Sequence, residues 1–115
     1  MLSRQDILQA DDLPTVEVDV PEWGGNLLVR MLTALELEDF TAVDDNRNVR
    51  ARFAVLAVVN ENGKRLFTDD DAEALGGKSM PALETVWKAG AKLNGIGQDE
   101  DAVKNFEKTP EPSSS

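Results

Sequence analysis

The segment that most constrains this chain is residues 15–20, where polar and apolar side chains alternate with a period of two. Three valines fall on one face and two acidic residues fall on the other: Val16, Val18 and Val20 against Glu17 and Asp19. This alternation is typical of a β-strand that buries one face. The strand is expected to end at Pro21, because proline has no backbone N–H to donate to a neighbouring strand.

A turn and a second strand follow directly. Residues 21–26 contain Gly24 and Gly25, which adopt positive φ at little steric cost. Residues 27–32 form a second β-like run, so residues 15–32 are predicted to make an antiparallel hairpin. An isolated hairpin is only marginally stable in water, and its valine face must therefore pack against the rest of the chain.

The remainder of the chain carries repeated signals for short helices. Thr33 and Glu36 form a capping-box sequence at the start of the first one, and Ser79 with Pro81 marks the start of the longest. The expected helices span about 33–43, 48–58, 68–76 and 79–94, with a weaker one at about 98–108. The predicted fold class is α+β and mostly α, with the N-terminal hairpin (about 15–32) packed on four to five short helices (about 33–107).

Residues 54–67 allow two interpretations. The apolar spacing in residues 50–57 has a period near 3.6, which favours a helix. The β-branched run Val55–Val59 and the turn residues Asn62-Gly63 are instead typical of a short hairpin. The helix is preferred, and the hairpin stays open as the alternative.

Three regions are expected along the chain. Residues 1–14 are predicted to be a flexible segment, because Asp11, Asp12 and Pro14 interrupt any helix begun there. Residues 15–97 are predicted to form a single globular domain. Residues 98–115 are expected to be weakly helical at first and then disordered, since the end of the chain is acidic and rich in proline and serine.

The composition argues against catalysis and metal binding. The chain has no cysteine and no histidine, which removes thiolate nucleophiles, disulfides, the commonest general base and the commonest transition-metal ligand. The acidic residues at 69–73 lack the alternating ligand positions of a calcium-binding loop, and they suit the positive end of a helix dipole instead. The sequence therefore predicts no catalytic residue, no cofactor and no metal site, and a protein that is not an enzyme.

The charge balance narrows the class of partner. The chain has 22 acidic and 12 basic residues, a net charge of −10, which disfavours nucleic acids and anionic membranes. No run approaches the ~20 apolar residues that span a bilayer, and the N-terminus lacks the apolar core of a secretory signal. A cytosolic protein that binds basic or apolar protein partners is expected.

Four apolar residues are candidates for partner binding: Trp23, Leu27, Leu66 and Phe67. Trp23 lies in a glycine-rich turn, and exposed tryptophan is enriched at binding hot spots; the alternative is that it covers the core as a lid. Leu66 and Phe67 precede a helix start at which only Ala72 is available for a hydrophobic staple, so part of their surface is expected to remain free for a neighbour.

Several segments occur in a characteristic order: Pro21-Glu22-Trp23-Gly24-Gly25, residues 29–36, the arginine-rich residues 50–59, residues 60–75 and Leu93-Asn94. Over about residues 3–97, this order and spacing resemble those of the tail assembly chaperones of long-tailed, non-contractile bacteriophages and prophages. None of the segments is a catalytic motif, so the resemblance depends on their succession along the chain.

The resemblance implies a protein that binds the tape measure protein, keeps it soluble and helps to recruit tail tube protein subunits during tail morphogenesis. It also implies self-association into open or spiral oligomers, a location in the cytoplasm of the bacterial host and absence from the mature virion. Members of this family are often made in a second, longer form by ribosomal frameshifting, for which the Pro/Ser-rich end of this chain would be suited. Two other functions remain as alternatives: a small acidic adaptor module, and a minor structural protein of the virion.

Overall fold

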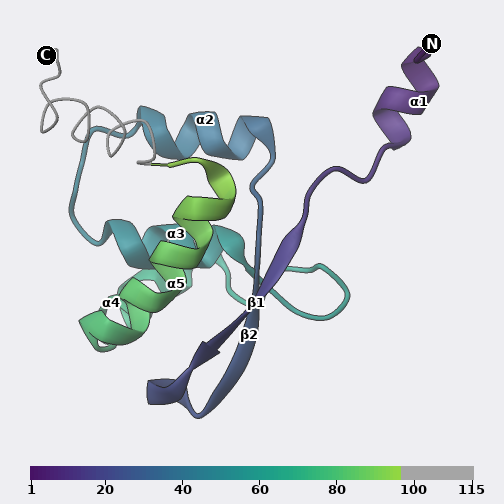
Figure 1. Cartoon of the computed structure of the whole chain (residues 1–115). Coiled ribbons are helices and arrows are strands. Elements are labelled where there is room, and N and C mark those ends of the chain that lie inside the picture. Colours follow the sequence, from purple (N-terminus) through teal and green to yellow (C-terminus); the bar gives the residue numbers. More distant parts are fainter. Residues whose placement is uncertain (97–115) are drawn as a thin grey trace, which may run out of the picture.

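A three-stranded antiparallel sheet in the order β1-β2-β3 organises residues 1–96, which are the residues that this computed structural model describes (Figure 1). The expected hairpin is formed by β1 (Thr15–Val20) and β2 (Gly25–Arg30). A turn of 3-10 helix, η1 (Pro21–Trp23), connects the two strands, and Gly24 then takes a φ of 79°, which is open to glycine without strain. The predicted α+β class, with a hairpin packed on short helices, is confirmed.

The register of the hairpin places its valines on one face. Val18 lies opposite Leu27, and Val16 lies opposite Val29; directly opposed residues share a face of an antiparallel sheet. Val18, Val20 and Val29 are buried, whereas Val16 remains 38% exposed near the start of β1. The period-two pattern therefore identified the buried face, although the burial does not extend to the first valine.

The ambiguous segment 54–67 contains both of the structures that its sequence suggested. Helix α3 (Val49–Ala57) ends where β3 (Val58–Val59) begins, and β3 pairs with β2. The chain then turns at residues 60–63, and Val59 forms an isolated bridge with Arg65. Residues 58 and 59 become a strand because the free edge of β2 supplies partners for their backbone groups, which no local pattern reports.

Local capping interactions fix the beginnings of two of the other helices. The Thr33 hydroxyl accepts a hydrogen bond from the Glu36 amide, and the Glu36 carboxylate accepts one from the Thr33 amide, as the capping-box sequence predicted. The Ser79 hydroxyl accepts from the Ala82 amide at the start of the longest helix. These two caps start α2 (Ala34–Ala42) and α5 (Met80–Asn94); η2 (Asp69–Asp71) and α4 (Ala72–Gly76) lie between α3 and α5 in the chain.

The core lies between the valine face of the sheet and helices α3 and α5. Phe53 of α3 is fully buried, with edge-to-face contacts to Phe40 of α2 and Trp87 of α5 at centroid distances of 5.7 and 5.2 Å. At Gly90, α5 comes so near to α3 that an added Cβ would lie 2.1 Å from a ring carbon of Phe53. Glycine is therefore required at this contact between the two helices.

Asn94, at the end of α5, ties that helix to the segment between β2 and α2. Its Oδ1 accepts a hydrogen bond from the Leu32 amide at 2.7 Å, and its Nδ2 donates to the Gly90 carbonyl at 2.9 Å. Leu32 is itself buried. The asparagine therefore satisfies a backbone donor that would otherwise lose its water on folding, and Gly95 then ends α5 with a φ of 72°.

The N-terminal segment, for which flexibility was expected, contains a short helix, α1 (Arg4–Gln9). A capping box between Ser3 and Asp6 starts it, and it ends before Asp11, where the sequence interrupts a helix. None of its residues is buried. Figure 1 shows α1 at the end of an extended segment, apart from the helices that pack on the sheet.

The weak helix expected at about 98–108 and the Pro/Ser-rich end lie outside the described residues. Within residues 1–96, the longest helix is α5 with 15 residues, fewer than the ~20 that a bilayer requires. No helix in this range is long and apolar enough to cross a membrane.

Candidate protein-binding surface

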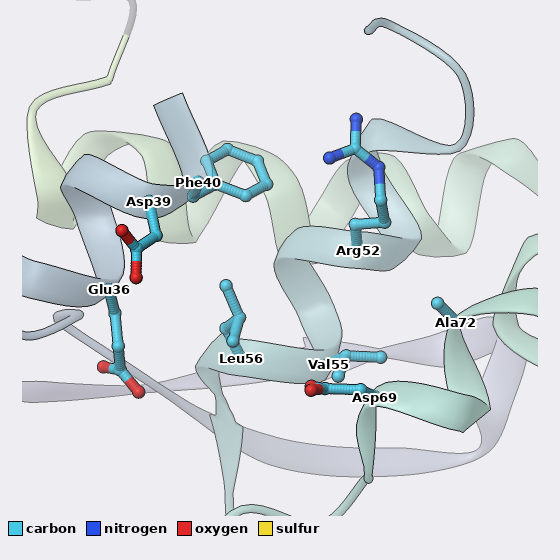
Figure 2. Close-up of a pocket in the computed structure, with 8 residues that line it drawn as sticks. All are labelled: Glu36, Asp39, Phe40, Arg52, Val55, Leu56, Asp69 and Ala72. Atoms are coloured by element: carbon cyan, nitrogen blue, oxygen red, sulfur yellow. The ribbon is translucent and has the colours of Figure 1, made fainter. Parts of the chain in front are cut away.

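An apolar groove of about 340 Å³ lies between α2, α3 and the start of α4 (Figure 2). Its apolar lining comes from Phe40, Val55, Leu56 and Ala72. Charged side chains complete the lining: Glu36, Asp39, Arg52 and Asp69. An apolar floor with a charged rim is the usual composition of a protein-binding site, because the floor provides affinity and the rim provides orientation.

An ion pair fixes the end of the groove nearest the sheet. Both Nη atoms of Arg30 donate to the Glu36 carboxylate at 2.9 Å, and Nη2 also donates to the Leu56 carbonyl at 2.8 Å. The Arg30 side chain is only 12% exposed, so water screens this pair little. The hydrogen bonds from Arg30 lower the pKa of Glu36 to about 2, which keeps this carboxylate ionised.

Two further arginines hold the opposite side of the groove. The Arg52 guanidinium lies over the Phe40 ring, 5.8 Å from its centroid, and donates to the backbone carbonyls of Asp45 and Arg47. Arg65 donates to the Val55 carbonyl at 2.9 Å and to the Asp69 carboxylate at 2.8 Å. The α2–α3 connection and the segment before α4 are therefore anchored to α3, and the groove keeps its shape.

The Glu36–Arg30 pair predicts how stability depends on pH. The pKa of Glu36 is lower in the folded protein than its ordinary value of 4.5, so the ionised carboxylate stabilises the fold above pH ~5, and this contribution is lost as the pH falls toward ~2. We expect Glu36→Gln to lower the Tm at pH 7. On acidification from pH ~5 to ~2, the Tm of this variant should then fall by less than the Tm of the wild type.

The measurement is thermal unfolding followed by circular dichroism across this pH range. The matched control is Glu38→Gln, because Glu38 lies on the same helix and is exposed. This variant should keep the wild-type dependence on pH. If Glu36→Gln lost as much Tm on acidification as the wild type does, the pair would not be a source of the acid sensitivity.

The four partner-binding residues predicted from the sequence lie at two separate places, and none of them lines the groove. Trp23 and Leu27, in η1 and β2, are half-buried against the core, an arrangement in which Trp23 covers the core while keeping part of its surface open. Leu66 and Phe67 follow β3: Phe67 is half-buried against the core, and Leu66 is 53% exposed. Leu66 therefore offers the most accessible apolar surface of the four.

The groove itself was not predicted from the sequence. One signal was present: α3 carries apolar residues around most of its circumference, with Phe53 facing the core and Leu56 facing the groove. A helix that is apolar on several sides needs cover on several sides. The pattern shows that α3 has apolar surface beyond one core-facing stripe, but the position of α2 decides which part stays open.

The acidic residues at 69–73 act in local structure. The Asp71 carboxylate accepts a hydrogen bond from the Thr68 amide at 2.8 Å, and Asp69 pairs with Arg65. Within the described part of the chain, no group of three or more carboxylates is arranged to hold a metal ion. Every buried side-chain polar atom there has a hydrogen-bond partner, so the described residues contain no buried polar side-chain atom that awaits a ligand.

Comparison with known proteins identifies the fold. No family model matches the sequence, and no curated protein is similar to it in sequence. The solved structure of the bacteriophage HK97 tail assembly chaperone matches this chain with a TM-score of 0.60 at 17% sequence identity, over 77% of this chain and 90% of that one. The likeness therefore spans nearly the whole of the HK97 protein, and this chain has the fold of a phage tail assembly chaperone.

Proposed function

We propose that this protein is a phage tail assembly chaperone that binds the tape measure protein, keeps it soluble and helps to recruit tail tube subunits. The observation that carries the proposal is the fold, which matches 90% of the HK97 tail assembly chaperone chain. The two partners, the tape measure protein and the tail tube protein, are inferred from the resemblance of the sequence to this family. The protein acts in the cytoplasm of the host and leaves the assembly before the virion is complete.

The surface chemistry supports this function. A net charge of −10 keeps the chaperone soluble while it covers an apolar client. Leu66 offers an exposed apolar side chain for the client, and the free edge of β1 beside Trp23 offers backbone groups for pairing. Copies that associate with one another along a long client bind it with avidity, because each docked copy raises the effective concentration of the next.

Co-expression with a tape measure protein tests the proposal. We expect the wild type to keep the tape measure protein in the supernatant after centrifugation, and we expect Leu66→Asp to lower the soluble fraction several-fold, because a charge at the contact disfavours an apolar client. Met80→Asp is the matched control: Met80 is 59% exposed, close to the 53% of Leu66, and lies at the start of α5. It should solubilise the client as the wild type does.

Two results would refute this function. One is a tape measure protein that aggregates equally with and without the wild-type chain. The other is the presence of the chain in stoichiometric amounts in purified virions, which would make it a minor structural protein instead. If Leu66→Asp and Met80→Asp both behaved like the wild type, the chaperone function would stand and Leu66 would be removed from the client surface.

A further inference from the structure

Helix α1 leaves its apolar side chains uncovered. Ile7 and Leu8 are 58% and 63% exposed, and Leu2, just before the helix, is 75% exposed. No residue of α1 is buried, and Figure 1 shows the helix apart from the body of the protein. A six-residue helix is far below the ~12–15 residues at which an isolated helix becomes even marginally stable in water. Docking against another surface would stabilise it.

The groove between α2 and α3 has the properties that such a helix needs. Its volume of about 340 Å³ lies in the range of about 300–1,000 Å³ that encloses small apolar groups, so it has room for a few aliphatic side chains. Leu35 lies one turn before the groove residue Asp39 on α2 and is 67% exposed, which extends the apolar surface beyond the groove.

One charge on α1 and one on the groove rim are also complementary. Arg4 lies three and four residues before Ile7 and Leu8, so it shares their side of α1. Asp39 lines the groove and is exposed, and none of its side-chain atoms takes part in an ion pair described for residues 1–96. When Ile7 and Leu8 of a docked α1 enter the groove, Arg4 therefore comes close to Asp39. Of the groove carboxylates, Asp39 is the one without an ion pair within residues 1–96.

We propose that α1 of one copy docks into the α2–α3 groove of a second copy, with Ile7 and Leu8 on the groove floor. In this structure α1 does not lie in its own groove: residues 11–14 lie beside the loop at 61–63, with which they line a second hollow, and Figure 1 shows α1 at the upper right of the view, separated from α2 at the upper left. A second copy is therefore the occupant that the geometry favours.

This contact joins two different surfaces of the same chain. Such a head-to-tail contact is heterologous, and it propagates into an open assembly unless the rotation between copies closes a ring. The inference rests on the self-association included in the proposed function and names the interface that produces it. The client surface at Leu66 lies outside the groove, so self-association and client binding can be tested separately.

The first experiment measures assembly by sedimentation velocity over a range of concentrations of the full chain. We expect the Ile7→Asp/Leu8→Asp double variant to weaken self-association about 10- to 100-fold, because two apolar anchors are lost and charge enters an apolar groove. The matched control is Gln5→Asp/Gln9→Asp, which adds the same two charges to polar positions of α1 and should assemble like the wild type. Since α1 has no buried residue, both variants should keep the Tm of the monomeric domain.

The second experiment uses the absence of cysteine from the chain. An Ile7→Cys chain is mixed with an affinity-tagged Leu56→Cys chain under mild oxidation, and the mixed disulfide is counted by mass spectrometry. We expect it to form at least about tenfold more than with a tagged Lys64→Cys chain, whose cysteine is exposed outside the groove, because docking raises the effective concentration of the two thiols.

Three results would overturn the inference. They are a wild-type chain that stays monomeric at every concentration, a mixed disulfide no more abundant than in the Lys64→Cys control, and an Ile7→Cys/Leu56→Cys chain that closes only an internal disulfide when diluted. The last would make a chain's own α1 the occupant. In each case the solubilisation of the tape measure protein would still test the proposed function separately. A failure of the interface can therefore be distinguished from a failure of the chaperone function.

Discussion

Replacing Phe53 with alanine is expected to lower the free energy of unfolding by about 3–5 kcal/mol, the range for removing a buried aromatic side chain. Phe53 is fully buried, and its ring contacts the rings of both Phe40 and Trp87. The substitution leaves a cavity at the place where α2, α3 and α5 meet. Because a domain of this size has a total stability of about 5–15 kcal/mol, much of its stability would be lost.

Urea denaturation followed by tryptophan fluorescence measures this change, since Trp87 reports on the same cluster. The control is Met80→Ala: Met80 is 59% exposed, so its truncation is expected to change the free energy of unfolding by no more than about 0.5 kcal/mol. A loss below about 1.5 kcal/mol for Phe53→Ala would mean that the helices close over the cavity, and that the aromatic cluster is not the centre of the core.

The second large effect is expected at Gly90, where general helix propensity and the tertiary structure predict opposite changes in stability on substitution by alanine. Alanine in place of glycine inside a helix normally stabilises it by about 1 kcal/mol. Here the new Cβ would lie 2.1 and 2.5 Å from two ring carbons of Phe53 and 3.3 Å from Val29. We expect Gly90→Ala to destabilise the protein by about 1–3 kcal/mol, because overpacking outweighs the gain in propensity.

Two comparisons make the Gly90 prediction specific. Gly25→Ala is the matched control, since an added Cβ at Gly25 meets nothing within 4 Å and the residue has no positive φ. Phe53→Leu shortens the side chain that would collide, so Gly90→Ala should cost less in the Phe53→Leu background than in the wild type. Equal costs in the two backgrounds would show that the two positions are not coupled.

The sequence identified the elements whose causes are local. The alternation at residues 15–20 follows from the period-two geometry of a strand, and the turn at Gly24 follows from the φ values that glycine can adopt. The helix starts at Thr33 and Ser79 follow from side-chain caps that reach only three residues along the chain. Each of these signals lies within a few residues of the structure that it predicts.

The functional surface was less accessible to sequence reasoning. Leu66 was singled out from an incomplete hydrophobic staple and is in fact exposed, although its role in binding remains a prediction. The groove was not anticipated, because it depends on where α2 and the segment before α4 lie relative to α3. Those positions are held by hydrogen bonds from Arg30, Arg52 and Arg65 to backbone carbonyls 26, 7 and 10 residues away. Such contacts leave no periodic trace along the chain.

The sequence by itself therefore determined the hairpin, the helix starts, the acidic surface and the absence of cysteine and histidine chemistry. Only the tertiary structure decided that Val58–Val59 joins the sheet, that Gly90 must be glycine, and that the other residues of the described range 1–96 leave both an apolar groove and the apolar side chains of α1 uncovered. The physical reason is range: caps and alternation act between neighbours in sequence, whereas strand pairing and packing join residues that only folding brings together.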